Sequence, residues 1–192
     1  MKRIVLASNN KHKIKEVKEI LGIEILTLND IGYLEEIDET GSTFLENALI
    51  KASTISKYLK EKKLDYDVIA DDSGICCEAL NLAPGVYSAR YSGGHRNSKA
   101  NRDKLINELK GKNKKAYFDC VMVLYHTDGT YEYKEGKTYG EIINEERGDT
   151  SFGYDCIFLS DDLGKTFGEA TSEEKNEVSH RYRALKQLKD LL

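Results

Sequence analysis

The stretch Ala70-Asp71-Asp72-Ser73-Gly74 directly follows the extended run Tyr66-Asp67-Val68-Ile69. The run predicts a strand, and the change to Asp, Ser and Gly predicts that the strand ends here and opens into a loop. Neighbouring side chains of a strand point to opposite faces, so within a strand at most one of the two aspartates faces the core. At a strand end beside a loop, both carboxylates reach a site.

Two interpretations of Asp71-Asp72 remain open on these residues alone. Paired carboxylates suit a hard divalent cation such as Mg²⁺, and one of them can accept a proton from water as a general base. Asp, Ser and Gly are also the common residues of a solvated turn. The rest of the sequence decides between a site and a turn.

The composition is that of a soluble globular protein. The chain has 192 residues, 40% of them hydrophobic and 32% charged. This length fits one or at most two domains, and we expect a single domain over residues 1–192. The formal net charge of −4 gives no support for broad binding to nucleic acid or membranes. No apolar run approaches the roughly 18 residues of a membrane-spanning helix, and the apolar N-terminal run stops at Ser8, too early for a signal peptide. We therefore expect a cytoplasmic protein with no nucleic-acid or membrane partner.

The cysteines give no sign of a structural metal site. Cys76, Cys77, Cys120 and Cys156 form no C-x-x-C pair. Buried free thiols are expected in a reducing compartment.

The N-terminal segment combines a strand, a polar loop and a helix. Ile4–Ala7 is an apolar run that predicts a buried strand, and apolar residues at helical spacing from Ile14 to Leu21 predict a helix. Between them lies Ser8-Asn9-Asn10-Lys11-His12-Lys13. A loop that ends at a helix N-terminus offers N–H groups and a favourable dipole to an anion. Phosphate binding and an ordinary capped helix with surface lysines are both consistent with this segment.

A second helix is predicted from Thr43-Phe44-Leu45-Glu46, which has the form of a capping box. It should run to about Lys60. Asn47 and Lys51 are four residues apart and therefore share one polar face. That face looks either into a cleft or into water.

The second half of the chain predicts a further helix and a hairpin. Residues 98–109 read as a helix that ends at a glycine, and Thr127-Asp128-Gly129-Thr130 lies between two strand-like runs. Helices alternate with strands before this hairpin. The pattern favours an α/β chain with a mixed sheet.

Two later segments carry candidate ligand contacts. The aromatic residues of Phe152-Gly153-Tyr154-Asp155 are either core residues or a stacking face for a base. Ser179 can cap a C-terminal helix whose first turn holds His180 and Arg181. Together with the upstream Lys175, this favours a binding role for that helix start.

In order along the chain, these motifs resemble the inosine/xanthosine triphosphate pyrophosphatase family, also called the HAM1-like or non-canonical purine NTP pyrophosphatases. Each motif is weak alone, but six in order at the family's spacing make a specific match over nearly the whole chain. The matching residues are Ser8-Asn9-Asn10 with Lys13; Glu39-Thr40-Gly41 with Phe44, Glu46-Asn47-Ala48 and Lys51-Ala52; Ala70-Asp71-Asp72-Ser73-Gly74; Ala83-Pro84-Gly85-Val86-Tyr87-Ser88-Ala89-Arg90-Tyr91; Phe152-Gly153-Tyr154-Asp155; and Ser179-His180-Arg181. The sequence departs from the family at Lys11-His12, where many members have a small residue and a glycine.

The resemblance implies hydrolysis of ITP, dITP and XTP to monophosphate and pyrophosphate, an activity that cleanses the nucleotide pool. It implies an elongated mixed β-sheet with flanking helices that form two lobes around a central cleft. It also implies a homodimer that uses Mg²⁺ as cofactor.

The resemblance further implies roles for individual residues. Asp72 matches the proton acceptor and metal-linked carboxylate, Glu39 matches a second metal-side acid, and Asp71 takes a supporting or second-metal role. The residues expected to contact the substrate on the triphosphate side are Ser8, Asn9, Asn10, Lys11, His12, Lys13 and Ser73, with Lys51 as a further substrate contact. The residues expected to contact the nucleoside are Phe152, Gly153, Tyr154, Asp155, Lys175, His180 and Arg181. A donor aimed at the 6-keto oxygen favours hypoxanthine and xanthine over adenine, and His180 and Arg181 are the candidates for it.

Two other functions are compatible with parts of the sequence. A Maf-like pyrophosphatase for other modified nucleotides is one, but the arginine-rich opening of that group is missing. A non-catalytic nucleotide-binding or RNA-binding module is the other. The acidic net charge disfavours RNA, and the acids Glu39, Asp71 and Asp72 disfavour a loss of catalysis.

Overall fold

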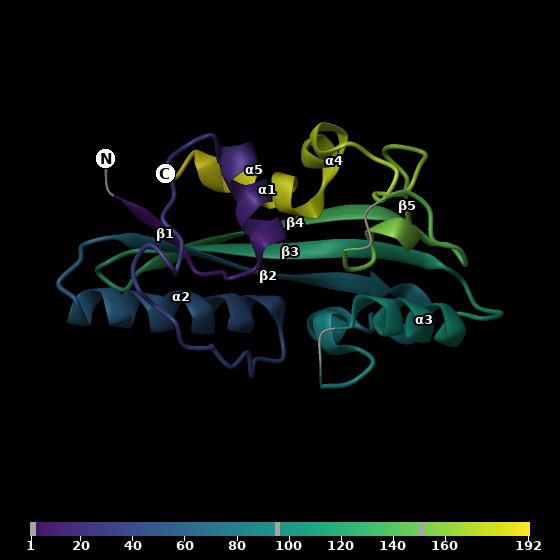
Figure 1. Ribbon diagram of the computed structural model, residues 1–192, viewed down its shortest axis with the longest axis horizontal. Coiled ribbons are helices and arrows are strands. Elements are labelled where there is room, and N and C mark those ends of the chain that lie inside the picture. The colour runs from purple at the N-terminus through teal and green to yellow at the C-terminus, as the bar shows by residue number, and fades with distance from the viewer. Residues whose placement is uncertain (1–2, 95–96, 150–151) are drawn as a thin grey trace. The chain divides into compact units, whose positions relative to one another are not determined.

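The computed structural model describes residues 3–94, 97–149 and 152–192. Its sheet has five strands in the order β1-β2-β3-β4-β5 (Figure 1). The strands are β1 (Ile4–Leu6), β2 (Asp67–Cys77), β3 (Lys115–Tyr125), β4 (Tyr131–Ile142) and β5 (Phe158–Ser160). Strands β1 and β2 are parallel, whereas β4 and β5 are antiparallel. The expected α/β class with a mixed sheet and flanking helices is therefore confirmed.

The helices are α1 (Lys11–Leu21), α2 (Phe44–Glu61), α3 (Ser98–Glu108), α4 (Ser172–Val178) and α5 (His180–Lys189), with 3-10 helices at Glu78–Leu80, Gly85–Arg90 and Asp155–Ile157. The helices do not strictly alternate with the strands, because α1 and α2 follow each other with only an isolated bridge residue, Leu26, between them. None of the helices in the described ranges has both the length and the apolar character needed to cross a bilayer.

The chain folds into two compact units that interleave in sequence. The first unit comprises Met1–Asp72, Cys120–Gly136 and Arg181–Leu192. The second comprises Ser73–Asp119 and Lys137–His180. Strands β2, β3 and β4 each contribute residues to both units. A single domain over residues 1–192, and the central cleft implied by the resemblance, stay predictions.

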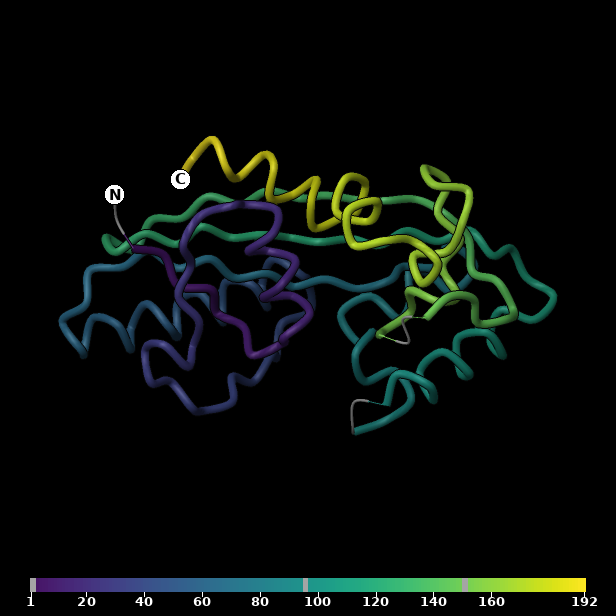
Figure 2. Tube along the Cα trace, turned by 45° about the horizontal axis from the view of Figure 1, so that its top comes forward, coloured from purple at the N-terminus to yellow at the C-terminus, as the bar shows by residue number. Residues whose placement is uncertain are grey.

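Side-chain alternation along the strands of the first unit creates two hydrophobic cores. One core packs the strands against α1 and α5, and its members include Leu6, Ile69, Met122, Val17 and Leu185. The other packs them against α2, with Val5, Val68, Ala70, Val123 and Ile55. Figure 1 shows α2 on one side of these strands and α1 and α5 on the other, and Figure 2 again shows α5 beside α1. The strands are apolar on both faces because both faces are covered.

Capping explains where the first two helices begin. The hydroxyl of Thr43 accepts from Glu46 N at 3.1 Å, and the Glu46 carboxylate accepts from Thr43 N at 3.2 Å, so α2 starts at the predicted capping box. Helix α1 starts earlier than expected. Asn10 caps it by accepting from His12 N and Lys13 N at 3.0 and 3.3 Å. Residues 11–13 therefore form the first helical turn rather than a loop.

The loop predicted within Ala70–Gly74 is wrong, because β2 continues through this stretch to Cys77. Ile75, Cys76 and Cys77 are apolar and buried, so packing overrides the turn preference of Asp, Ser and Gly. The two aspartates consequently lie inside a strand and point to opposite faces of the sheet.

The second unit has one apolar core. Ile75, Phe118, Leu105, Phe158 and Phe167 are among its buried members. Helix α3 spans most of the range predicted for it, residues 98–109.

Strands β3 and β4 form the predicted hairpin. The turn of this hairpin lies in the first unit, where His126 N donates to Thr130 O at 2.8 Å. All four cysteines are buried and none of them forms a disulfide, as expected.

Candidate active site

Asp71 lies on the face of β2 that packs against α1 and α5. Its Oδ2 accepts from Lys13 Nζ at 2.8 Å and from Arg181 Nη2 at 3.3 Å, and Arg181 also binds Glu16. The Asp71 side chain is fully buried. Burial alone would raise the pKa of this carboxyl, but the charges of Lys13, Arg181 and Lys51 outweigh it and hold the pKa well below its ordinary value. The lowered pKa favours the ionised form of Asp71.

The two oxygens of Asp71 differ in their hydrogen bonding. Oδ1 is buried and has no hydrogen-bond partner. Burying an acceptor without a partner costs about 1–3 kcal/mol. Within the first unit, this atom is an open position for a donor or a cation.

Asp72 lies on the opposite face of β2, towards α2. Its Oδ2 accepts from Asn47 Nδ2 at 2.9 Å. Burial raises the pKa of Asp72, and the negative charge of Glu39 raises it further, whereas the charges of Lys51 and Lys13 lower it. The resulting pKa lies above the ordinary value for an aspartate. A carboxylate whose pKa is shifted towards neutrality is better matched to accepting a proton from water.

Lys51 supplies a buried positive charge next to these acids. Its Nζ lies 2.6 Å from Glu39 Oε1, and only 8% of the residue is exposed. Burial would lower the pKa of this ammonium, but Asp71, Asp72 and Glu39 outweigh burial and raise it. Lys51 therefore remains charged and reduces the repulsion between Glu39 and Asp72.

The fit of a divalent metal to these acids depends on which carboxylates are considered. In residues 3–94, 97–149 and 152–192, no three His, Cys, Asp or Glu side chains form a ready-made metal cluster. The negative charge of Glu39 nevertheless raises the pKa of Asp72, and a cation would relieve this repulsion. Mg²⁺ commonly binds one or two carboxylates together with substrate phosphates and water. The donor chemistry of Glu39 and Asp72 therefore fits Mg²⁺, whereas one oxygen of Asp71 is already held by two cations.

The segment Ser8–Lys13 enters the first unit's site through Lys13. Ser8 Oγ accepts from Asn10 N at 3.2 Å, and the Asn10 cap takes two N–H groups at the start of α1. Asn9, Lys11 and His12 are exposed. This segment is thus a capped helix start with positive charge, and its binding of phosphate stays a prediction.

In the second unit, the Phe152–Asp155 segment is held by several side chains. Tyr154 is buried and its hydroxyl donates to Ser88 O at 2.6 Å, which makes it a core residue. Asp155 Oδ2 lies 2.7 Å from Lys175 Nζ. Arg102 Nη1 donates to Gly153 O at 2.9 Å.

The other predicted contacts of the second unit are partly covered. Phe152 and Ser73 are half-buried. The ring of His180 is buried and stacks on Phe118, with 4.8 Å between centroids and 13° between planes. Of the two aromatic residues Phe152 and Tyr154, only Phe152 keeps a partly exposed ring for stacking on a base.

The structure brings together three groups of the predicted residues, two in the first unit and one in the second. Lys13, Asp71 and Arg181 form one group in the first unit, and Glu39, Lys51 and Asp72 form the other. Phe152–Asp155 and Lys175 form a group within the second unit.

Three residues that the sequence did not assign to the site take part in these groups: Glu16, Asn47 and Arg102. The shared polar face of Asn47 and Lys51 was the one available signal for Asn47.

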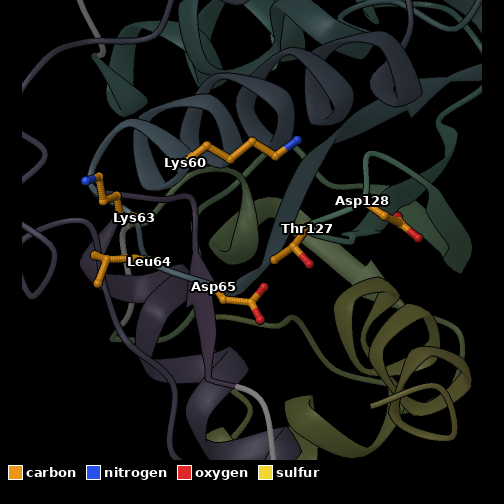
Figure 3. Close-up of a pocket in the computed structure, with 6 residues that line it drawn as sticks. All are labelled: Lys60, Lys63, Leu64, Asp65, Thr127 and Asp128. Atoms are coloured by element: carbon orange, nitrogen blue, oxygen red, sulfur yellow. The ribbon is translucent and has the colours of Figure 1, made fainter.

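An open pocket of about 360 Å³ lies elsewhere in the first unit (Figure 3). It is lined by Lys60, Lys63, Leu64, Asp65, Thr127 and Asp128. None of these is a candidate site residue, and the lining holds two lysines and two aspartates, so it has little net charge. The buried charges around β2 are the better candidate for chemistry.

Comparison with known proteins gives matches along the whole chain. The model of the Ham1 family matches residues 4–191. The dITP/XTP pyrophosphatase of Clostridium perfringens is 49% identical over 199 residues, covering 100% of this chain and 98% of the relative. The dITP/XTP pyrophosphatase of Bacillus subtilis is 44% identical over 198 residues, with the same coverage of 100% and 98%.

Solved structures agree with this result. The Staphylococcus aureus Ham1 protein has a TM-score of 0.87 and 38% identity, covering 99% of this chain and 97% of that one. A nucleoside-triphosphatase / dITP/XTP pyrophosphatase from Mycobacterium abscessus has a TM-score of 0.75 and 38% identity, with 97% of each chain covered. The family model spans almost every residue, and the relatives are similar from end to end. The chain therefore belongs to the Ham1 family.

Proposed function

We propose that this protein hydrolyses the non-canonical purine nucleoside triphosphates ITP, dITP and XTP to monophosphate and pyrophosphate. The observation that carries the proposal is the environment of Asp72, a buried carboxylate with a raised pKa beside Glu39 and Lys51. A poised base surrounded by cationic side chains suits water attack on a polyanion. The names of the relatives, dITP/XTP pyrophosphatase, support the substrate class.

In this proposal Asp72 is the general base. Its Oδ2 is held by Asn47, and it takes a proton from the water that attacks the triphosphate. Pyrophosphate is a fair leaving group once its charge is neutralised, so no covalent nucleophile is needed. Ser73 then contacts the substrate rather than attacking it.

Charge neutralisation falls to the lysines and the start of α1. Lys13 and Lys51 carry positive charge beside the acids, and the N-terminus of α1 adds the positive end of the helix dipole. Ser8–Lys13 would lie along the triphosphate. This arrangement stabilises charge that builds up as the bond to pyrophosphate breaks.

We also propose Mg²⁺ as the cofactor, held by Glu39 and Asp72 together with phosphate oxygens. When bound, Mg²⁺ would neutralise phosphate charge and polarise the bond to the leaving group. The buried oxygen of Asp71 that has no hydrogen-bond partner is the candidate for a supporting or second-metal contact.

The nucleoside contacts proposed are Phe152–Asp155, Lys175, His180 and Arg181. Each of the second-unit groups is held in place by neighbours, as shown by the Asp155–Lys175 pair and the stacked His180 ring. Arg181 is bound to Glu16 and Asp71, so its contact with a base requires that these bonds be exchanged. The homodimer implied by the resemblance and the cytoplasmic location expected from the sequence both stay predictions.

A panel of nucleotides tests the function directly. Purified protein with Mg²⁺ should release pyrophosphate from ITP, dITP and XTP far faster than from ATP or GTP, and a chelator should stop turnover. Release of single phosphate, or equal rates on ITP and ATP, would contradict the proposal. Turnover confined to other modified nucleotides would favour the Maf-like alternative. Binding without turnover of any nucleotide would favour a non-catalytic module.

A further inference from the structure

Three side chains of α2 hold the segment that precedes the helix. Lys51 binds Glu39 at 2.6 Å, and the Asn47 carboxamide accepts from Gly41 N at 2.8 Å. The Glu46 carboxylate accepts from the next two backbone N–H groups at 2.6 and 3.2 Å. The segment that carries Glu39 is therefore fixed along the first turns of α2 by several consecutive contacts.

Asn47 differs from the other two because it also reaches β2. Its Oδ1 accepts from Gly41 N, and its Nδ2 donates to Asp72 Oδ2 at 2.9 Å. Gly41 N is always a donor, so the amide atom facing it must be the oxygen. The amide nitrogen must then face Asp72. One fully buried side chain thus links Asp72 to the backbone of the segment that carries Glu39, two residues beyond that acid.

Gly41 shows how closely the backbone approaches this amide. A Cβ atom at residue 41 would lie 2.7 Å from Asn47 Oδ1 and 2.7 Å from Glu46 Cβ. Both distances are shorter than van der Waals contact, and neither Asn47 nor Glu46 is free to move, since each is hydrogen-bonded. Any larger residue at this position would push the segment away from the helix.

We propose that Asn47 is a positioning residue: it fixes the carboxylate of Asp72 relative to the segment that carries Glu39. Gly41 is required for this link. The inference rests on the proposed function, because it assigns Asp72 as the base. The hydrogen bond from Asn47 to Oδ2 fixes the orientation in which the Asp72 carboxylate meets the attacking water. In this role Asn47 acts through Asp72 and does not itself exchange the proton.

Asparagine is the residue type that the link demands. It offers one acceptor and one donor at the tip of a short side chain. Aspartate would face Gly41 N equally well but would place a second carboxylate against Asp72 Oδ2. Alanine would remove both bonds.

The first test compares Asn47→Ala with Ser56→Ala, a matched control at another buried polar residue of α2. Removing a side chain that orients a metal-linked or catalytic group commonly costs about 10–100-fold in activity. We expect Asn47→Ala to lower kcat by this amount with KM for ITP within about threefold, and Ser56→Ala to leave kcat unchanged. A change in kcat of less than twofold for Asn47→Ala would overturn the inference.

The second test is a double-mutant cycle between residues 41 and 47. Gly41→Ala should lower kcat to a similar extent as Asn47→Ala, and the double variant should be no slower than either one, because both break the same link. Additive losses would show that the two residues act separately and would overturn the proposed link.

The third test needs no turnover. In Asn47→Asp two carboxylates meet, whereas combining it with Asp72→Asn exchanges donor and acceptor and restores the hydrogen bond. The unfolding free energy of the double variant should exceed that expected from the two single variants, while turnover stays absent. Additive unfolding free energies would refute direct contact between the side chains.

The wild-type measurement separates the two proposals. If the wild-type protein releases no pyrophosphate from ITP, dITP or XTP, the proposed function fails. If the wild-type protein is active and Asn47→Ala is equally active, the positioning role fails alone.

Discussion

Asp71 and Asp72 are neighbours in sequence and share one strand, yet their surroundings differ in almost every respect. Asp71 faces α1 and α5, where Lys13 and Arg181 hold one of its oxygens. Asp72 faces α2, where its neighbours are an amide, a lysine and another acid. The pKa of Asp71 is lowered and that of Asp72 is raised.

This difference shows that burial alone does not decide the protonation state of a carboxylate. Both residues are buried, and burial raises the pKa of both. The number and sign of nearby charges then decide the outcome. Asp71 is therefore suited to holding cations in place, and Asp72 is suited to exchanging a proton.

The largest expected effect is on turnover at Asp72. Asp72→Asn keeps the shape of the side chain but removes the base, so kcat should fall by about 10²–10⁴-fold. Steady-state release of pyrophosphate measures this loss. Calorimetry with a non-hydrolysable ITP analogue should show that binding largely survives. If Asp71→Asn lost as much activity as Asp72→Asn, the division of roles would be wrong.

The next effect is on stability at Asp71. Asp71→Asn leaves Lys13 and Arg181 buried with less negative charge around them, and breaking a buried ion pair in this way costs about 3–5 kcal/mol. Chemical denaturation should show this fall in the unfolding free energy. A decrease in unfolding free energy of less than about 1 kcal/mol would mean that Lys13, Asp71 and Arg181 are more solvated than their burial indicates.

The pH dependence should have opposite sign at the two positions. For Asp72 the folded pKa is raised, so its stabilisation is complete below the ordinary pKa of about 3.9 and is lost as the pH rises through the folded pKa. At pH 7 in chelator, Asp72→Asn should therefore be more stable than wild type, by on the order of 1 kcal/mol. This gain should shrink as the pH falls.

For Asp71 the folded pKa is lowered, so its stabilisation is present above about pH 3.9 and is lost as the pH falls towards the folded pKa. The deficit of Asp71→Asn should therefore be full at neutral pH and smaller in strong acid. Unfolding free energies of both variants and wild type at several pH values test the two signs together. Parallel pH profiles for the two variants would contradict the comparison.

The smallest expected effect is on the unfolding free energy at His126, which contacts Asp67, a third aspartate of β2. Asp67 and Glu132 flank His126 at 3.2 and 2.6 Å. Burial lowers the pKa of His126, but its bonds to Glu132 and Asp67 outweigh burial and raise it. Its stabilisation is complete below about pH 6.5 and is lost as the pH rises through the folded pKa.

His126→Gln should therefore lower the unfolding free energy at pH 6 by less than about 1 kcal/mol, because the pair is partly exposed. At pH 9 the unfolding free energies of the variant and the wild-type protein should differ less than at pH 6. Denaturation with urea at the two pH values measures this. An equal deficit at both would show that charge on His126 is not involved.

Local signals allowed much of the fold to be predicted from the sequence. The capping box of Thr43 and Glu46 located the start of α2, and the Asp128-Gly129 turn located the hairpin. Both signals act between residues a few positions apart. The course of β2 was missed because Asp, Ser and Gly favour turns locally, whereas buried neighbours keep the strand extended.

The candidate site was predicted as a set of residues but not as an arrangement. Arg181 was expected to face a base, and its bonds to Glu16 and Asp71 join residues 165 and 110 positions apart. No local pattern reports such contacts. The role of Asn47 likewise depends on a strand 25 positions away.

The alternation along β2 also constrains how this protein can change in evolution. Deleting one residue between Asp67 and Asp71 would move each following side chain to the other face. The aspartate now beside Lys13 and Arg181 would turn towards α2, and its neighbour would turn away. Insertions and deletions in this strand should therefore be tolerated only when they change its length by an even number of residues. The length of β2 is in this sense constrained by the active site.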